Sequence, residues 1–274
     1  GKGPGELSNV GSVFVLDSML LVADVGQRRL NVYDRSTGEF LFHRRYEGSL
    51  ETASWLNGRM WFGAQNIARQ TGIAAWDIQS DSFSYLVPMP PEYRESEPLA
   101  GIYTRVSVVG WSDTLLLGFQ GLNELRLMRT DGTMIDSVSI PVRRRRGVSP
   151  DIGAQIMGLS FPEMFSLSSA LFALYRLESG DFAAIHYDQE IVESHISSRV
   201  FVSLLSSDLD RACVDKLLPN PDETQVRTTM RGDTLFVLQQ EVEGTKARTV
   251  IKEYLISDIG CAWISTASGR EADG

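Results

Sequence analysis

Three histidines are the side chains of this sequence best suited to hold a metal ion or to act as a general base. Neutral imidazole is a common zinc ligand, and histidine titrates near neutral pH. A shared site requires the histidines to converge, but His43, His186 and His195 fall at unequal positions of the repeated segments described below. We therefore expect separate histidines, each satisfied locally or exposed, and a chain without a metal or other cofactor.

Serine or cysteine catalysis has little support in the sequence. A nucleophile of this kind needs a histidine and an orienting carboxylate within reach. The chain has no Gly-x-Ser-x-Gly segment, and its serines fall in turns. The Asp-rich turns at 208–210 and 222–223 lack the spacing of a calcium-binding loop. We expect no catalytic residue and favour a protein that is not an enzyme.

Several aspartates recur at matching points of the repeated segments. A pair of carboxylates could hydrolyse a glycosidic bond if the fold brought them together. Recurrence in each repeat is explained more simply by hydrogen bonds within each turn. We therefore predict a structural role for Asp24, Asp34, Asp77 and Asp188, and for Asp113 in a hairpin turn.

Four consecutive arginines, Arg143, Arg144, Arg145 and Arg146, stand out in a chain with a net charge of −9. Their guanidinium groups repel one another and cannot all be buried, so we expect them on an exposed loop between repeats. The loop is either simply solvated or a docking point for an acidic protein surface or anionic lipid headgroups. A proline-rich stretch at 88–98 is a second segment that a partner could recognise, or it simply connects two repeats.

Composition limits both the class of protein and the class of partner. With 274 residues, 43% of them hydrophobic, the chain is able to bury a sizeable core. No stretch approaches the roughly 18 apolar residues of a membrane-spanning helix. The excess of 35 acidic over 26 basic residues has the wrong sign for binding a phosphate backbone, so nucleic acid is not expected as a partner.

The two cysteines, Cys213 and Cys261, cannot form a zinc site by themselves. They are either two buried thiols or one disulfide. Both flank the last repeated unit, so we expect a disulfide that fastens the end of the chain to its own unit. Such a bond persists in oxidising compartments and therefore predicts an exported protein.

A repeat organises the chain. Segments at 16–24, 56–63, 111–118 and 230–238 each combine a polar turn with a short apolar strand, and 168–174 is a weaker fifth copy. Further strands before and after each segment give four strands per unit. Such units, without amphipathic helices, predict an all-β fold, a β-propeller of four-stranded antiparallel blades. We expect a single domain over 1–264 and a flexible tail at 265–274, with about five blades at 7–46, 51–89, 103–140, 163–197 and 224–264.

The first unit resembles the repeat of NHL-type propellers. The likeness lies in Gly-Lys-Gly-Pro-Gly-Glu-Leu at 1–7, Leu-Val-Ala-Asp at 21–24, Arg-Arg-Leu-Asn-Val-Tyr-Asp at 28–34 and Gly-Glu-Phe-Leu at 38–41. The layout is similar to that of bacterial six-bladed propeller proteins, many of them exported. The resemblance implies a six-bladed type of architecture and an extracytoplasmic location, periplasmic or secreted. Because the 1–7 segment follows a first blade in such proteins, it also implies either one blade outside the numbered chain or a total of five.

A propeller fold hosts enzymes, ligand binders and docking platforms, so it carries little information about function. We expect a non-catalytic interaction module, an extracytoplasmic scaffold or accessory subunit whose partner is another protein or a membrane-associated complex. Two alternatives stay open. One is a propeller lyase or hydrolase with a metal or carboxylate site at its central channel, and the other is a propeller that binds a small ligand.

Overall fold

Antiparallel hairpins build most of the described chain. Polar turns separate short strands rich in Val, Leu, Phe and Trp, which favour a pleated and half-buried backbone. Within the residues that the structure describes, helical structure is limited to short turns such as α3 (Ile152–Gln155) and η1 (Ile256–Asp258). The computed structural model describes residues 3, 5–48, 50–66, 71–91, 93, 105–148, 152–155, 158–160, 163–164, 166–192, 195–218, 226–243 and 246–266.

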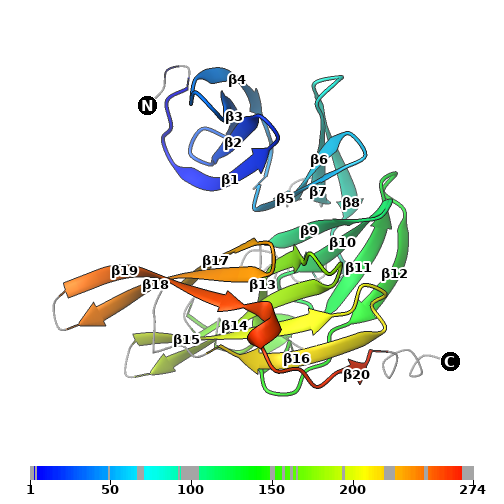
Figure 1. Cartoon of the computed structure of the whole chain (residues 1–274), viewed down its shortest axis with the longest axis vertical. Helices are drawn as coiled ribbons and strands as arrows, with labels where there is room; N and C mark the ends of the chain where they lie inside the picture. The colour runs from blue at the N-terminus through cyan, green and yellow to red at the C-terminus, as the bar shows by residue number, and fades with distance from the viewer. Residues whose placement is uncertain are drawn as a thin grey trace. The chain divides into compact units, whose positions relative to one another are not determined.

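The first three sheets each contain four strands in sequence order (Figure 1). The first sheet comprises β1 (Val10–Leu16), β2 (Met19–Asp24), β3 (Arg29–Asp34) and β4 (Phe40–Arg45). The second comprises β5 (Thr52–Leu56), β6 (Arg59–Asn66), β7 (Thr71–Asp77) and β8 (Ser82–Pro88). The third comprises β9 (Val106–Trp111), β10 (Thr114–Phe119), β11 (Glu124–Arg129) and β12 (Met134–Ser139).

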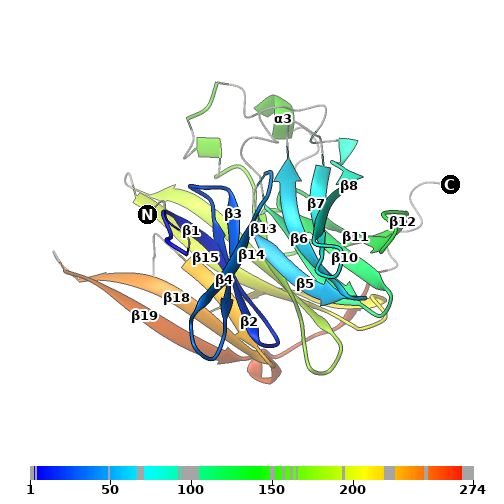
Figure 2. The ribbon, with the colours of Figure 1, turned by 90° about the horizontal axis from the view of Figure 1, so that it is seen from above.

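The last two sheets depart from the four-stranded pattern. The fourth comprises β13 (Ala170–Arg176), β14 (Phe182–Val192), β15 (His195–Leu205) and β16 (Arg211–Leu217), and β20 (Ile264–Ser265) adds a fifth strand to the edge of β16. The fifth has three strands within the described residues, β17 (Val226–Arg231), β18 (Thr234–Glu243) and β19 (Lys246–Leu255). Its last two strands form a long twisted hairpin (Figure 2).

These sheets are the blades of an all-β propeller, so the predicted fold class is confirmed. The hairpin turns expected between strands are also present. Asp17, Asn57 and Ser112 occupy them with positive φ angles of 45°, 51° and 55°, a backbone region that Asp and Asn tolerate better than most residues. The polar residues in the sequence therefore predicted correctly where the first hairpin turn of these blades lies.

The fourth blade extends further than the expected range of 163–197. The segment 182–188 matches the third strand of other repeats in sequence, but it lies in the second strand, β14, and the sheet continues through β16 to Leu217. The turn between β15 and β16 contains no glycine, and Leu209 adopts a φ of 62° in it. A hairpin without the usual turn residues leaves little trace in the sequence.

The chain forms two compact units. One comprises Gly1–Ala100, Thr104–Leu117 and Leu127–Ile135, and the other comprises Gly101–Tyr103, Gly118–Arg126 and Asp136–Gly274. In the first, the core combines aliphatic and aromatic side chains, and Phe62 packs edge-on against Phe14 with ring centres 5.5 Å apart. In the second, the core is mostly aliphatic and includes Cys213. None of the described helices is long and apolar enough to cross a membrane.

The carboxylate of Asp24 fixes the segment that leads into the first sheet. It is buried at the end of β2 and accepts the main-chain N–H groups of Ser8 at 2.7 Å and Asn9 at 3.2 Å. The N–H and the side-chain amide of Gln27 donate to it at 3.1 and 3.0 Å. Burial raises the pKa of Asp24, but these hydrogen bonds outweigh burial and lower it overall.

Asp34 and Asp77 act one turn later, as the sequence predicts. Each ends a third strand, and each carboxylate accepts the N–H groups two and three residues further on. Hydrogen bonds from Ser36 and Thr37 lower the pKa of Asp34 to about 2. These carboxylates stabilise exposed turns, which is the structural role expected for them.

Replacing Asp24 by Ala removes the acceptor for several N–H groups at once. We expect Asp24→Ala to lower the free energy of unfolding by about 2–3 kcal/mol, measured by urea-induced unfolding. The sequence predicted the same role for Asp113, but Asp113 is exposed in its hairpin and its carboxylate accepts no hydrogen bond from the described residues, so Asp113→Ala is the matched control. An equal loss of stability in both variants would contradict the role assigned to Asp24.

Candidate functional site

The arginine loop, residues 143–146, is held to the fourth sheet by its own backbone. The N–H groups of Arg143, Arg144 and Arg145 converge on Oδ2 of Asp215, at 2.5, 2.7 and 3.3 Å. Asp215 lies on β16 with a φ of 54° and is fully buried. Successive N–H groups that face one acceptor form an anion-binding concavity, here filled by a side chain of the same protein.

Arg145 is buried, which corrects the expectation that all four arginines lie on the surface. Its side chain is 0% exposed, and its Nε pairs with Oδ1 of Asp215 at 2.9 Å. Its terminal nitrogens donate to Oδ1 of Asn123 at 2.8 Å and to the carbonyl of Ile140 at 3.1 Å. Burial lowers the pKa of Arg145, and the carboxylate of Asp215 opposes that effect. A guanidinium group with this many acceptors can stay charged inside the protein.

Arg146 contacts a second buried carboxylate, that of Asp188. The main-chain N of Arg146 lies 3.3 Å from Oδ2 of Asp188, and its Nε lies 3.7 Å from the same atom. Arg199 on β15 adds a third contact at 3.6 Å. Burial raises the pKa of Asp188, and the neighbouring arginines oppose it. Asp188 therefore holds the arginine loop from within β14, whereas the sequence predicted that it would hold a turn.

The side chains of Arg143 and Arg144 remain exposed. Within the described part of the chain, neither guanidinium group has an ion-pair or hydrogen-bond partner. Arg146 differs, because its guanidinium also donates to the carbonyl groups of Ser166 and Gln189. The loop thus presents two free cations on a backbone that buried carboxylates hold in place.

The histidines lie in separate surroundings, as far as the structure describes them. His43 on β4 is half-buried and stacks on Phe40 with ring centres 6.3 Å apart. His186 on β14 is buried, and neither ring nitrogen has a hydrogen-bond partner. The side chain of His195 is outside the described part. Among the described residues, no three His, Cys, Asp or Glu side chains are grouped closely enough to hold a metal ion.

Cys213 and Cys261 form the predicted disulfide, with Cα atoms 5.6 Å apart. The sequence suggested that this bond would fasten the terminal segment to its own blade, and that expectation is wrong. Cys213 lies on β16, so the bond joins the segment after η1 to the preceding sheet. Trp263 follows Cys261 by two residues, and the guanidinium group of Arg211, two residues before Cys213, lies over its ring at 5.5 Å. The disulfide and β20 therefore attach the chain end to the same outer edge.

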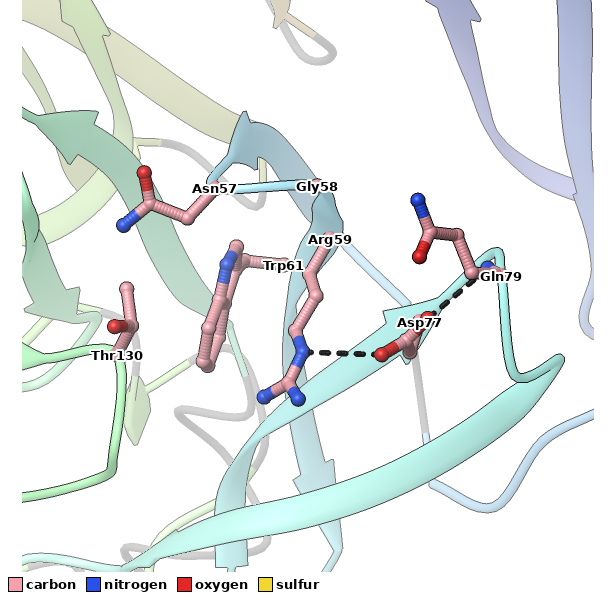
Figure 3. A pocket seen from close by; sticks show the side chains of 7 residues that line it. All are labelled: Asn57, Gly58, Arg59, Trp61, Asp77, Gln79 and Thr130. Atoms are coloured by element: carbon pink, nitrogen blue, oxygen red, sulfur yellow. Dashed lines mark hydrogen bonds and ion pairs between the residues drawn. The ribbon is translucent and has the colours of Figure 1, made fainter.

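A polar pocket of about 360 Å³ lies beside the β5–β6 hairpin (Figure 3). Arg59 pairs with Asp77 at 3.5 Å, and the other oxygen of Asp77 accepts the N–H of Gln79 at 3.0 Å. Trp61 is fully buried, and its Nε1 donates to the carbonyl of Leu56 at 3.2 Å. Both oxygens of Asp77 are engaged, so this pocket offers no unpaired carboxylate for acid–base chemistry. Its lining residues are Asn57, Gly58, Arg59, Trp61, Asp77, Gln79 and Thr130.

A second pocket, of about 490 Å³, lies between the first two sheets of the same unit. No motif in the sequence points to it, because its arginines and aromatic residues come from separate turns and strands. The only available signal is the pair of doublets Arg28-Arg29 and Arg44-Arg45. Its lining residues are Gln27, Arg28, Arg45, Tyr46, Glu47, Phe83 and Tyr85.

Of the proline-rich connector, the structure describes only the first part. Met89 and Tyr93 are buried there, so those side chains contribute to packing. Residues 94–98 are outside the described residues, as is most of the expected tail at 265–274.

Comparison with known proteins identifies the fold. The sequence matches no protein-family model and no curated protein. A Bacteroides fragilis protein that is assigned as exported matches 88% of this chain and 68% of its own chain, with a TM-score of 0.56 and 13% identity. Kuenenia stuttgartiensis hydrazine synthase matches 96% of this chain and 68% of its own chain, with a TM-score of 0.52 and 10% identity. At such identities the similarity supports the propeller fold alone.

Breaking the buried ion pair should destabilise the protein. We expect Arg145→Met to lower the free energy of unfolding by about 3–5 kcal/mol, because the Asp215 carboxylate would stay buried without its cation. Arg144→Met is the control in the same loop and should unfold at the same urea concentration as the wild type. If the two variants lose stability equally, the burial of Arg145 is not what stabilises the loop.

His186 should make stability fall in mild acid. Burial, assisted by the nearby charge of Arg145, holds the pKa of His186 well below its usual value of 6.5. The unfolded chain then binds a proton that the folded chain does not. Below pH 6.5 the free energy of unfolding should therefore fall by up to about 1.4 kcal/mol per pH unit.

The variant His186→Leu isolates this contribution. Thermal unfolding between pH 7.5 and 5 should show a smaller loss of stability in the variant than in the wild type, and no loss at pH 7.5, because Leu leaves no unpaired nitrogen. Parallel pH profiles for the two proteins would contradict the prediction.

Proposed function

We propose that this chain is a non-catalytic interaction module that docks on an acidic protein surface through the arginine loop. The observation that carries the proposal is the exposed pair Arg143 and Arg144, whose backbone is fixed by Asp215. A loop that is ordered before binding loses little conformational entropy when a partner engages it. Guanidinium groups suit carboxylates at such a surface, because their planar forks bind both oxygens.

A protein surface suits this loop better than a membrane. Basic segments that bind anionic lipids contain roughly 4–8 Lys or Arg side chains, whereas two of the four arginines here are engaged within the protein. The chain as a whole carries a net charge of −9, which repels any anionic partner, but this repulsion is largely screened beyond the Debye length of about 8 Å. A local contact between two guanidinium groups and a few carboxylates of an acidic protein needs only short-range attraction.

The same proposal includes an extracytoplasmic location and a role as an accessory subunit. The Cys213–Cys261 disulfide supports the location, because such bonds persist in oxidising compartments. The assignment of the Bacteroides fragilis protein as exported agrees with it. The resemblance to NHL-type six-bladed propellers belongs here as well, and its support is that residues 10–45 form the first blade.

The test removes the two free cations and keeps the buried one. Arg143→Ser/Arg144→Ser should weaken association with the protein partner in native extracts by about 1–3 kcal/mol and flatten its salt dependence. A fourfold substitution is unsuitable, because the loss of Arg145 would unfold the loop. The readout is the amount of partner retained by immobilised protein across a salt titration.

Arg227→Ser/Arg231→Ser is the matched control, because it removes two exposed arginines from β17 and changes the net charge equally. The control should retain the partner as well as the wild type does. Equal binding by all three proteins would refute the docking role. Binding to phosphatidylserine vesicles that depends on Arg143 and Arg144 would replace the protein partner by a membrane.

A further inference from the structure

The pocket between the first two sheets gathers positive charge in an acidic protein. Arg28 comes from the turn after β2, and Arg45 ends β4. Both are exposed, and neither guanidinium group has an ion-pair or hydrogen-bond partner in the described part of the chain. In the same sheet Arg29 lies directly opposite Arg45. Like charges facing each other across two strands are unfavourable.

The same group of cations acts on the neighbouring His43. Burial lowers the pKa of His43, and the cations of Arg29, Arg44 and Arg45 lower it further. Arg44 is paired with Asp81, which leaves Arg28, Arg29 and Arg45 without a described counterion. An unfavourable cluster of this kind in a folded protein is a reason to look for an anion that relieves it.

The backbone at Arg28 adds a second cost. Its φ is 52°, in the left-handed region where Gly and Asn are preferred. A long charged side chain gives no local advantage in such a turn. Because Arg28 lines the pocket, its guanidinium group can instead contact a ligand bound there.

Tyr46 is a buried residue in the wall of the same pocket. The residue is 3% exposed, and its phenol oxygen is buried without a hydrogen-bond partner. Burial, with Asp24 and Glu51 next in effect, raises the pKa of Tyr46 to about 12. The phenol is therefore protonated at neutral pH. Because solvent does not reach this hydroxyl group, Tyr46 contributes its ring to the pocket wall and no hydrogen bond to a ligand.

Aromatic rings form the remaining wall. Phe83 and Tyr85 on β8 stack with ring centres 6.4 Å apart, and Phe83 also stacks on Trp76 at 6.1 Å. The hydroxyl of Tyr85 accepts the N–H of Glu47 at 2.6 Å, which fixes that ring. Packed rings of this kind present a flat apolar surface, and they favour a planar ligand.

We propose that this pocket binds a small aromatic carboxylate. The guanidinium groups of Arg28 and Arg45 would hold the carboxylate, and Phe83 with Tyr85 would contact the ring. The two arginines and Glu47 sum to one positive charge, which matches a monoanion. The inference does not depend on the arginine loop, because every lining residue lies in the other compact unit.

Calorimetric titration of the full chain tests the ligand class. Benzoate serves as the probe, benzamide as its neutral isostere and inorganic phosphate as an anion without a ring. We expect benzoate to bind at least tenfold more tightly than either comparison compound. Equal binding of phosphate and benzoate would indicate an adventitious ion only, and an absence of benzoate binding at 10 mM would overturn the proposal.

Three variants test the assigned residues while keeping the fold. Arg28→Asn suits the positive φ, and Tyr46→Phe removes only the unpaired hydroxyl, so both should melt at or above the wild-type temperature. We expect Arg28→Asn and Arg45→Gln to weaken benzoate binding at least tenfold, and Tyr46→Phe, which keeps the ring in the pocket wall, to leave affinity unchanged.

Arg129→Gln is the control, since it removes one exposed arginine at the end of β11 and should leave affinity unchanged. Unchanged affinity in Arg28→Asn and Arg45→Gln would overturn the proposal even if benzoate binds. So would a loss of affinity in Arg129→Gln equal to that in Arg45→Gln, because binding would then follow net charge and not the pocket.

Discussion

A buried carboxylate that accepts main-chain N–H groups is the interaction on which this fold depends. Asp24, Asp188 and Asp215 are all 0% exposed, and each accepts N–H groups from a segment that precedes a sheet. Strand pairing satisfies the backbone within a blade but not the segment that enters it. Ionised carboxylates can satisfy several such groups at once, and they are stable in the interior only when they do. The connection between blades is therefore as specific as the blades themselves.

Both functional proposals concern segments that such buried carboxylates hold in place. In the arginine loop, the backbone and one guanidinium satisfy Asp215, and the remaining side chains are free to face outwards. In the first unit, Asp24 holds Gln27 and thereby the turn that carries Arg28. In both places an internal anion organises the chain, and uncompensated cations are left on the surface beside it. A chain with a net charge of −9 can display such cations without becoming basic overall.

Local patterns were enough to predict the fold class, the early hairpins, the turn role of Asp34 and Asp77, and the disulfide. Each depends on residues close together in the sequence, or on two cysteines with no other available partner. The burial of Arg145 was not predictable, because most of its acceptors are distant: Asp215 is 70 positions away and Asn123 is 22. The sequence predicted a turn role for Asp188, because residues 182–188 resemble the third strand of other repeats. They lie in the second strand of their sheet, β14, so Asp188 does not precede the expected turn. The pocket beside Tyr46 could not be predicted, because its aromatic rings and its arginines come from strands and turns that are distant in the sequence.

The disulfide also determines how the molecule would carry mechanical load. Cys213 and Cys261 close a covalent loop, and β17, β18 and β19, spanning 226–255, lie entirely inside it. Tension applied at the C-terminal end would pass through the sulfur bridge directly to β16 and bypass the fifth sheet. That sheet is thus shielded from pulling as long as the bridge is intact, and reduction would place its three strands in the line of force.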